Sequence, residues 1–263
     1  APESKWHYRA LLAAGKQSIV VDFERENDVD RLVAVLGQAD VALISSDWAA
    51  DLSEKLRAAL KNTAILCDLT AFGGSGPLAG QRYTDSMLQA CSGLMDTTGS
   101  SEGPPTLTQV PITECCAAVF ATAGILSALR SRSRFTTQTV EVALFDTAVS
   151  MLSTFLPAHF VGECPTRIGN RHTAMSPWNA YRAQDGWVLL CSASNDMWRR
   201  VCDVIERSDL KSDARFATMG GRVTLAAEVD AAIQPWVNTH AVSECVQRFS
   251  AAGIACGPVY AVE

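Results

Sequence analysis

The sequence lacks a surplus of positive charge, and this limits its partners. It carries 22 lysines and arginines against 28 aspartates and glutamates, a net charge of -6. A nucleic-acid-binding domain would present a basic face, so we expect no nucleic acid among the partners. An anionic small molecule is still allowed, provided that basic residues gather locally around it.

Long apolar runs and a leader segment are also missing. No run reaches the roughly 18 uncharged apolar residues of a membrane-spanning helix. The first residues, Ala1 to Lys5, show no basic segment followed by an apolar one, so no secretory signal is predicted. We therefore expect no membrane partner and a cytoplasmic location.

Paired cysteine and histidine motifs are absent as well. The nine cysteines are scattered without a Cys-x-x-Cys motif, and Cys115 and Cys116 are neighbours. An odd number in a chain long enough for a large core favours reduced thiols over a disulfide framework. The four histidines lie far apart, so we expect no metal site.

What is present is an ordinary globular composition, 48% hydrophobic and 19% charged. Apolar runs at 18–23, 40–44 and 64–67 predict strands, and amphipathic segments at 28–36 and 51–60 predict helices. Such alternation indicates a parallel sheet. Further helices are predicted at 87–95, 115–128 and 146–155, with a strand at 139–145.

The last third of the sequence predicts a second, smaller unit. Strands are expected at 186–192 and 257–260, and helices at 196–205, 222–236 and 243–252. A polar segment separates this part from the first. The fold class is therefore α/β, a Rossmann-like parallel sheet with helices plus a smaller α+β domain. We expect a large domain over 1–165, a linker over 166–177 and a small domain over 178–263.

Three motifs in a fixed order carry most of the functional signal. Residues 62–77 read NTAILCDLTAFGGSGP, residues 85–95 read DSMLQACSGLM, and residues 110–116 read VPITECC. In order and spacing, they resemble the class III CoA-transferases of the CaiB/BaiF type, a superfamily that includes formyl-CoA transferase and α-methylacyl-CoA racemase. The family's nucleophilic aspartate falls on Glu114.

The resemblance covers nearly the whole chain. Further counterparts are TVEVALFD at 139–146, RIGNRH at 167–172, DGWV at 185–188, DARF at 213–216 and AGIACGPV at 252–259. Family members carry additional segments before and after the matched region. We therefore expect the N- and C-terminal segments to be missing, which leaves the large domain incomplete at its N-terminus.

Glu114 is the candidate nucleophile that the resemblance implies. Family members move CoA from an acyl-CoA to a free carboxylate, through covalent acyl and CoA intermediates on a carboxylate. A glutamate keeps the charge, and a helix start with free N–H groups favours the ionised form. Its additional methylene can displace the attacking oxygen by about an ångström, enough to cost on the order of a hundredfold in rate. The alternative is an ordinary glutamate in the first turn of a helix.

Asp85 is the second candidate acid. The resemblance implies a place beside the active site, whereas its position before a helix also fits an N-cap. Racemases of the superfamily carry a histidine at the preceding position; Thr84 cannot serve as that base, so racemisation is disfavoured. Asp146 is explained by capping. His172 is explained as a hydrogen-bonded loop residue.

Fewer residues are expected to contact CoA in this chain than in members of the family. Glu24 replaces a family lysine, and the loop at 45–50 is shortened. The CoA-binding candidates are Arg82, Tyr83, Thr84, Arg25, Trp48 and Lys55, and the candidate active-site loop is Phe72, Gly73, Gly74 and Gly76. For the basic residues the alternative is a solvated surface charge. The glycines give the turn backbone freedom but lack a phosphate-loop motif.

These observations favour a CoA-transferase acting on an acyl-CoA and a free carboxylic acid, with CoA as a substrate and no permanently bound cofactor. A homodimer, or pairing with another domain of the family, is expected. Two alternatives stay open. One is a degenerate, non-catalytic domain with an assembly role. The other is a CoA-dependent lyase or isomerase on the same fold.

Overall fold

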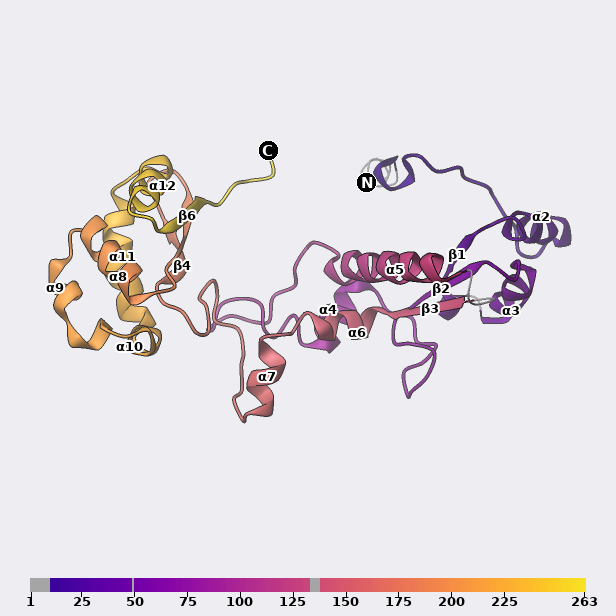
Figure 1. Ribbon diagram of the computed structural model, residues 1–263, viewed down its shortest axis with the longest axis horizontal. Helices are drawn as coiled ribbons and strands as arrows, with labels where there is room; N and C mark the ends of the chain where they lie inside the picture. The colour runs from indigo at the N-terminus through magenta and orange to yellow at the C-terminus, as the bar shows by residue number, and fades with distance from the viewer. Residues whose placement is uncertain (1–9, 49, 133–137) are drawn as a thin grey trace. The chain divides into compact units, whose positions relative to one another are not determined.

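The computed structural model describes residues 10–48, 50–132 and 138–263, and leaves out the side chains of residues 48 and 50–54. The chain forms two compact units (Figure 1), which are described separately below. Unit 1 holds Ala1–Leu88 and Val110–Met151, and unit 2 holds Gln89–Gln109 and Leu152–Glu263. These units group residues by contact, so the predicted domain division at 166–177 stays a prediction.

A parallel sheet organises unit 1. Its strands β1 (Val41–Ile44), β2 (Ile65–Thr70) and β3 (Gln138–Ala143) lie in the order β1-β2-β3. In the register, Ile44 pairs with Asp68, which in turn pairs with Glu141. The central strand β2 is buried at nearly every position, as expected for a parallel strand with neighbours on both edges.

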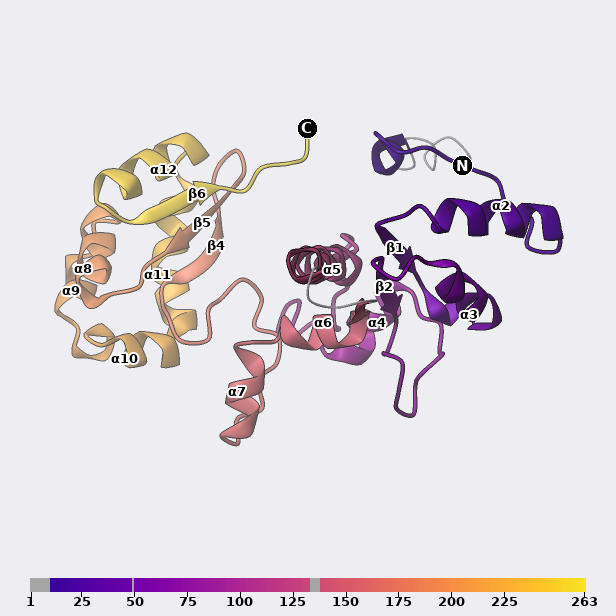
Figure 2. The same ribbon diagram turned by 45° about the vertical axis from the view of Figure 1, so that its right-hand side comes forward.

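Helices accompany this sheet. They are α2 (Glu26–Leu36), α3 (Ala50–Ala59), α5 (Ile112–Ser131) and α6 (Leu144–Ser150), with a short 3₁₀ turn η1 (Ser46–Trp48) after β1. Helix α4 (Asp85–Ser92) begins in unit 1 and ends in unit 2. Figure 2 shows α5 on one side of the sheet and α2 and α3 on the other. Gly124 permits the close approach of α5 to β3, because a Cβ there would lie 2.6 Å from Val140 Cγ1.

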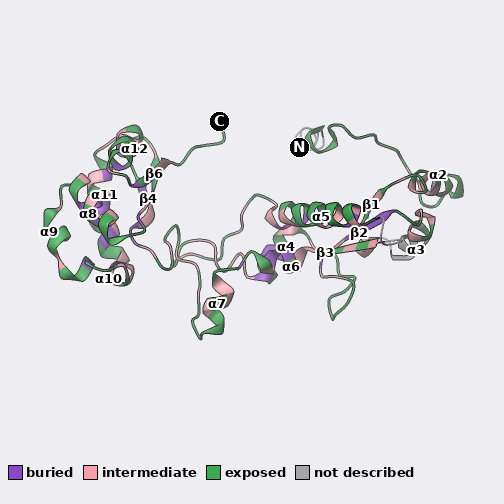
Figure 3. Ribbon diagram, viewed as in Figure 1, coloured by how far each residue is buried: buried purple, intermediate pink, exposed green. Residues whose placement is uncertain are grey.

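Helix α5 has one buried face and one exposed apolar face. The buried face carries small residues, among them Ala117 and Ala121, which pack with Cys67 and Val142. By length and composition, α5 is the one helix among the described residues that could cross a membrane, and 22% of its most apolar stretch is buried. Figure 3 shows most of its remaining surface as exposed. Core helices have the same length and composition, so this feature is only weak evidence for a membrane span.

Unit 2 is built on an antiparallel sheet. Strands β4 (Trp178–Arg182), β5 (Trp187–Cys191) and β6 (Ala255–Pro258) lie in the order β4-β5-β6. The accompanying helices are α7 (Phe155–Phe160), α8 (Asn195–Val204), α9 (Ser208–Ser212), α10 (Met219–Thr224), α11 (Ala226–Asn238) and α12 (Val242–Ala251), with the 3₁₀ turn η2 (Ala214–Phe216). Trp198, Phe249 and Val188 belong to one apolar core.

An arginine lies at the centre of this core. Arg222 is fully buried, and burial lowers its pKa. Its Nε donates to Ser176 O at 2.9 Å and its Nη1 to Phe216 O at 2.8 Å, while its Nη2 donates to Asn195 Oδ1 at 3.1 Å. The guanidinium also lies 5.7 Å from the ring centroid of Trp198. One side chain thus joins α10 to η2, to the start of α8 and to the chain before β4.

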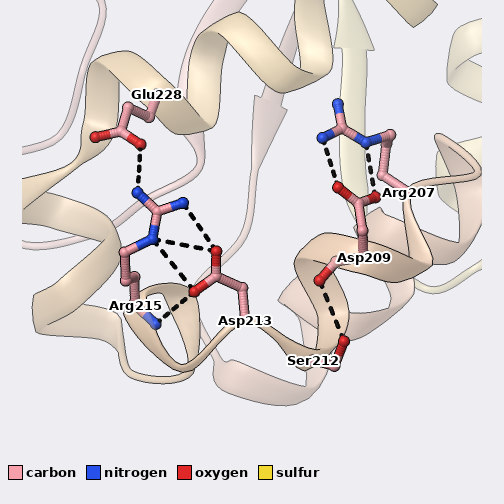
Figure 4. A network of polar contacts seen from close by, with 6 residues as sticks. All are labelled: Arg207, Asp209, Ser212, Asp213, Arg215 and Glu228. Carbon is pink, nitrogen blue, oxygen red and sulfur yellow. Dashed lines mark hydrogen bonds and ion pairs between the residues drawn. The ribbon is translucent and has the colours of Figure 1, made fainter.

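The surface of unit 2 carries ion pairs that contribute less to stability than the buried Arg222 does. Figure 4 shows Arg207 with Asp209, and Arg215 with Asp213 and Glu228. Hydrogen bonds from Arg207 and Arg215 lower the pKa values of Asp209 and Asp213. Because these side chains are solvated, such pairs add little to stability.

The predicted fold class is confirmed as a mixed α/β fold with a parallel sheet, helices and a separate antiparallel sheet. The strand expected at 18–23 is wrong: Ile19 and Val20 are 58% and 95% exposed, and the segment is irregular. A strand needs a neighbour to pair with, and among the described residues this segment has none. Strand β4 was missed. The helix expected at 146–155 ends at Ser150, and the one at 222–236 breaks at Leu225.

We predict that Arg222→Met lowers the free energy of unfolding by about 3 kcal/mol, because the buried carbonyl oxygens of Ser176 and Phe216 lose their donor. Urea denaturation of the purified chain measures this change. Arg199→Met is the matched control, since Arg199 is exposed on α8 and its loss should change stability by less than about 0.5 kcal/mol. Equal effects of the two substitutions would contradict the central role of Arg222.

Candidate active site

A pocket of about 270 Å³ lies in unit 1. Residues at or just after the carboxyl ends of all three parallel strands line it: Ser45 and Asp47 after β1, Leu69, Thr70 and Ala71 at the end of β2, and Leu144 after β3. Arg82, Tyr83, Glu114, Ala117 and Ala118 complete the lining. Ligands of open α/β sheets bind outside the carboxyl ends of the strands, so this pocket is the candidate active site.

Asp47 holds two parts of the wall together. Its Oδ2 accepts a hydrogen bond from Ala71 N at 2.6 Å, and its carbonyl oxygen accepts one from Arg82 Nε at 2.8 Å. The loop after β1 is thereby tied to the end of β2 and to the segment before α4. Arg82 is thus held at the pocket through its Nε.

An ion pair between a buried carboxylate and a partly exposed arginine supports the same region. Asp68 on β2 is 5% exposed; its Oδ2 lies 2.6 Å from Arg57 Nη2 on α3, and its Oδ1 accepts from Ser46 N at 3.0 Å. A buried carboxylate needs such partners to offset the loss of water. Asp68 therefore fixes α3 and the loop after β1 against β2.

Aromatic contacts fix the position of Tyr83. Its ring meets Phe72 edge to face, with centroids 4.8 Å apart, and Phe72 lies 5.5 Å from Phe145. Phe72 follows β2 and opens the glycine turn, in which Gly73 and Gly76 have φ values of +88° and +98°. Gly73 N donates to Thr70 Oγ1 at 2.9 Å. The hydrogen bond to Thr70 thus fixes the start of the turn, and Phe72 at that start packs against the Tyr83 ring.

Glu114 stands in the first turn of α5 and lines the pocket. The residue is exposed, and among the described residues no group donates a hydrogen bond to its carboxylate. Ala117 and Ala118 follow it along the pocket side of the helix. Their small side chains leave room in front of the carboxylate.

Asp85 has a different position. It is absent from the pocket lining, and its Oδ1 accepts hydrogen bonds from Thr113 N at 2.8 Å, from Glu114 N at 3.1 Å and from the Thr113 hydroxyl. The N–H groups of Thr113 and Glu114 are therefore not free, contrary to the expectation for this helix start, because both donate to Asp85. The sequence position of Asp85 fits an N-cap of the helix that follows it. The structure shows instead that Asp85, at the start of α4, caps α5.

Of the other predicted site residues, Arg82 and Tyr83 lie in the lining, and the remaining ones whose side chains the structure describes do not. Thr84 is exposed, and its carbonyl begins α4 by accepting from Met87 N. Arg25 pairs with Asp22 at 3.1 Å, and Lys55 is exposed on α3. The side chain of Trp48 lies outside the described residues. The glycine turn next to Tyr83 contains the candidate loop residues Phe72, Gly73, Gly74 and Gly76.

Two further residues weighed from the sequence lie elsewhere. Asp146 is exposed in the first turn of α6 and lines a separate hollow beside β3 with Glu141. His172 belongs to unit 2, where its Nδ1 accepts from Ala174 N at 3.0 Å and its ring centroid lies 5.0 Å from that of Trp178. The structure thus places neither at the candidate active site.

Sequence reasoning missed part of the lining. Ser45, Asp47, Thr70, Ala71 and Leu144 were not proposed as site residues, although each lies at or just after the end of a parallel strand. The rule for open α/β sheets, applied to the ends of the predicted strands, would have drawn attention to these positions.

Comparison with known proteins agrees with the motif series. A sequence model of the family described as CoA-transferase family III matches residues 3–263. The acetyl-CoA:oxalate CoA-transferase of Acetobacter aceti is 29% identical over 96% of this chain and 67% of its own length. The succinyl-CoA:mesaconate CoA-transferase of Haloarcula hispanica is 29% identical over 86% of this chain and 59% of its own.

Solved structures give the same result. A CAIB/BAIF family protein from Brucella suis matches with a TM-score of 0.83 and 26% identity, over 94% of this chain and 67% of its own. A protein from M. tuberculosis matches with a TM-score of 0.79 and 26% identity, over 94% of this chain and 68% of its own. The predicted resemblance is therefore confirmed. The chain spans about three fifths to two thirds of the length of the curated relatives it matches.

We predict that Arg57→Met lowers the free energy of unfolding by about 2 kcal/mol, because the buried Asp68 carboxylate loses its cation. Chemical denaturation measures the effect. Lys55→Met on the same helix is the matched control and should be nearly neutral, since Lys55 is exposed. An Arg57 variant as stable as the unmodified protein would show that the pair does not support the pocket.

Proposed function

The chain belongs to CoA-transferase family III, and we propose that it moves CoA from an acyl-CoA to a free carboxylic acid with Glu114 as the nucleophile. One observation carries the proposal. The carboxylate at the position of the family's nucleophile lines a pocket at the carboxyl ends of the parallel strands. A carboxylate suits this reaction because it attacks an acyl carbon and can itself be activated and released.

The first half of the reaction loads CoA onto the protein. An oxygen of Glu114 attacks the carbonyl carbon of the acyl-CoA, and the carbon–sulfur bond breaks to give a mixed anhydride and the CoA thiolate. The thiolate then attacks the Glu114 carbonyl carbon of the anhydride. This step releases the donor acid as its carboxylate and leaves CoA on Glu114 as a thioester.

The second half transfers CoA to the acceptor. The acceptor carboxylate attacks the Glu114 thioester carbonyl, and the CoA thiolate leaves as a new mixed anhydride forms. The thiolate then attacks the acceptor carbonyl carbon of that anhydride, which yields the new acyl-CoA and restores the Glu114 carboxylate. No net proton, electron pair or external reductant is consumed.

The walls of the pocket suit a short acyl group. A volume of about 270 Å³ lies just below the range of roughly 300–1,000 Å³ that is usual for ligand pockets. Hydroxyl groups of Ser45, Thr70 and Tyr83 and the guanidinium of Arg82 line it, and such donors can stabilise the oxyanion that forms at the reacting carbonyl. In this proposal CoA is a substrate, the enzyme has no permanent cofactor and works in the cytoplasm, and Thr84, Arg25, Trp48 and Lys55 are kept as candidate contacts for CoA.

We predict that Glu114→Gln lowers the transfer rate by at least about a thousandfold, because a neutral amide cannot act as the nucleophile. Glu114→Asp should retain transfer, since it keeps the carboxylate. Chromatography of new acyl-CoA, with several short acyl-CoA donors and acids, measures the rate. Glu26→Gln is the control, because Glu26 is exposed on α2.

A trapping experiment tests the intermediate itself. Hydroxylamine or borohydride added during turnover should modify Glu114, and peptide mass spectrometry locates the modified residue. Transfer that survives Glu114→Gln would overturn the assignment. Turnover of an acyl-CoA to a cleaved or isomerised product without any acid acceptor would instead support the lyase or isomerase alternative.

The exposed face of α5 favours a second candidate function, an assembly role. Val119, Phe120 and Leu126 are 70%, 48% and 61% exposed, and apolar residues gathered on one exposed helix face are typical of interaction surfaces. A second copy of the chain or another domain of the family is the proposed partner. Assembly is compatible with catalysis, and it would be the main role if CoA did not bind.

We predict that the chain self-associates and that Leu126→Glu weakens this association by at least about tenfold, since a charge would be buried at the contact. Sedimentation velocity over a concentration series measures it. Val35→Glu on α2, where Val35 is 55% exposed, is the matched control. A monomer at all concentrations would contradict self-association through this face.

A further inference from the structure

Helix α5 has no cap from its own flanking residues. Its N-cap is Pro111, which makes no side-chain capping bond, because a proline ring carries no acceptor. The first N–H groups of a helix have no partner within the helix. Here the N–H of Ile112 donates to Val110 O at 2.7 Å, and that of Cys115 to Pro111 O at 3.0 Å. The N–H groups of Thr113 and Glu114 require another acceptor.

Asp85 supplies that acceptor from an earlier part of the chain. Its Oδ1 takes the Thr113 N–H at 2.8 Å and, 29 positions along the sequence, the Glu114 N–H at 3.1 Å. It also accepts from the Thr113 hydroxyl, and Thr113 is 1% exposed. Three donors on two consecutive residues therefore converge on one carboxylate oxygen.

These bonds fix the backbone from which the Glu114 side chain extends. Because the N–H of Glu114 itself is bound, a shift of the helix start would break a hydrogen bond to a charged acceptor, which is stronger than one to a neutral group. The same bonds occupy N–H groups that could otherwise turn towards the Glu114 carboxylate. The carboxylate is thus left to react with a ligand in the pocket.

We propose that Asp85 is a positioning residue, whose carboxylate caps α5 and holds Glu114 at the pocket without exchanging a proton with the substrate. Its absence from the pocket lining and the donors already gathered on its Oδ1 carry this inference. The expected effect of Asp85 on the reaction rate rests on the proposed function of Glu114. The expected effect of Asp85 on the helix start does not.

Two substitutions separate positioning from proton transfer. Asparagine is as good a helix cap as aspartate but is a poor acid or base, so Asp85→Asn should keep kcat within about fivefold. Asp85→Ala removes the acceptor, and a displaced nucleophile should lower kcat by about a hundredfold. The KM for acyl-CoA should change by less than about twofold, because the pocket lining is intact. Asp30→Asn, an exposed position on α2, is the control.

Amide hydrogen exchange gives a readout that does not depend on activity. The N–H groups of Thr113 and Glu114 should exchange at least about tenfold faster in Asp85→Ala than in Asp85→Asn, since only the alanine variant opens the helix start. If Asp85→Ala does not fold, Thr113→Val replaces it in the test, because it removes only the hydroxyl donor to Asp85. We expect it to lower kcat by about threefold to tenfold.

The outcomes are distinct. If Asp85→Asn loses as much activity as Asp85→Ala while both keep the wild-type exchange rates, Asp85 takes part in the chemistry and positioning is wrong. If the unmodified chain transfers no CoA, the proposed function fails, and the exchange rates alone then decide whether Asp85 holds the helix start. Unchanged exchange in Asp85→Ala would overturn the proposal in either case.

Discussion

The candidate active site depends on how the start of helix α5 is held. Hydrogen bonds from the N–H groups of Thr113 and Glu114 to one oxygen of Asp85 set where the helix begins. Packing of the helix against β2 and β3 sets the direction in which it runs. With its start and direction fixed, the helix places Glu114, a first-turn residue, at the pocket beside the carboxyl ends of the strands.

The remaining walls follow the same principle, in which an acid organises the backbone around the pocket. Asp68 holds the loop after β1 and helix α3, and Asp47 holds Ala71 and Arg82. The Asp68 carboxylate contacts Arg57 and Ser46, whereas Asp47 accepts from Ala71 N through its carboxylate and from Arg82 through its main-chain carbonyl oxygen. Such bonds have fixed geometry, so they define a rigid rim. Glu114 differs from them, because no group among the described residues donates a hydrogen bond to its carboxylate, which lines the pocket.

Much of the fold could be predicted, because apolar periodicity reports local structure directly. Strands β1, β2 and β3 and helices α2, α3 and α5 lie close to the predicted ranges. The failures had tertiary causes. Residues 18–23 have a strand-like composition, but a strand exists only where another strand pairs with it. For the site, the family resemblance led to Glu114, Arg82 and Tyr83, whereas Asp47 and Thr70 join the pocket because they lie at the ends of strands.

The sequence by itself determined the family resemblance, the alternation of strands and helices and the acid at the nucleophile position, because each is a property of residue order. Only the tertiary structure decided what each acid does. Asp85 and Glu114 look equivalent along the chain, as acids at or near predicted helix starts. Folding turns one towards the backbone N–H groups of α5 and the other into the pocket, since hydrogen-bond partners distant in sequence are assigned only when the chain packs.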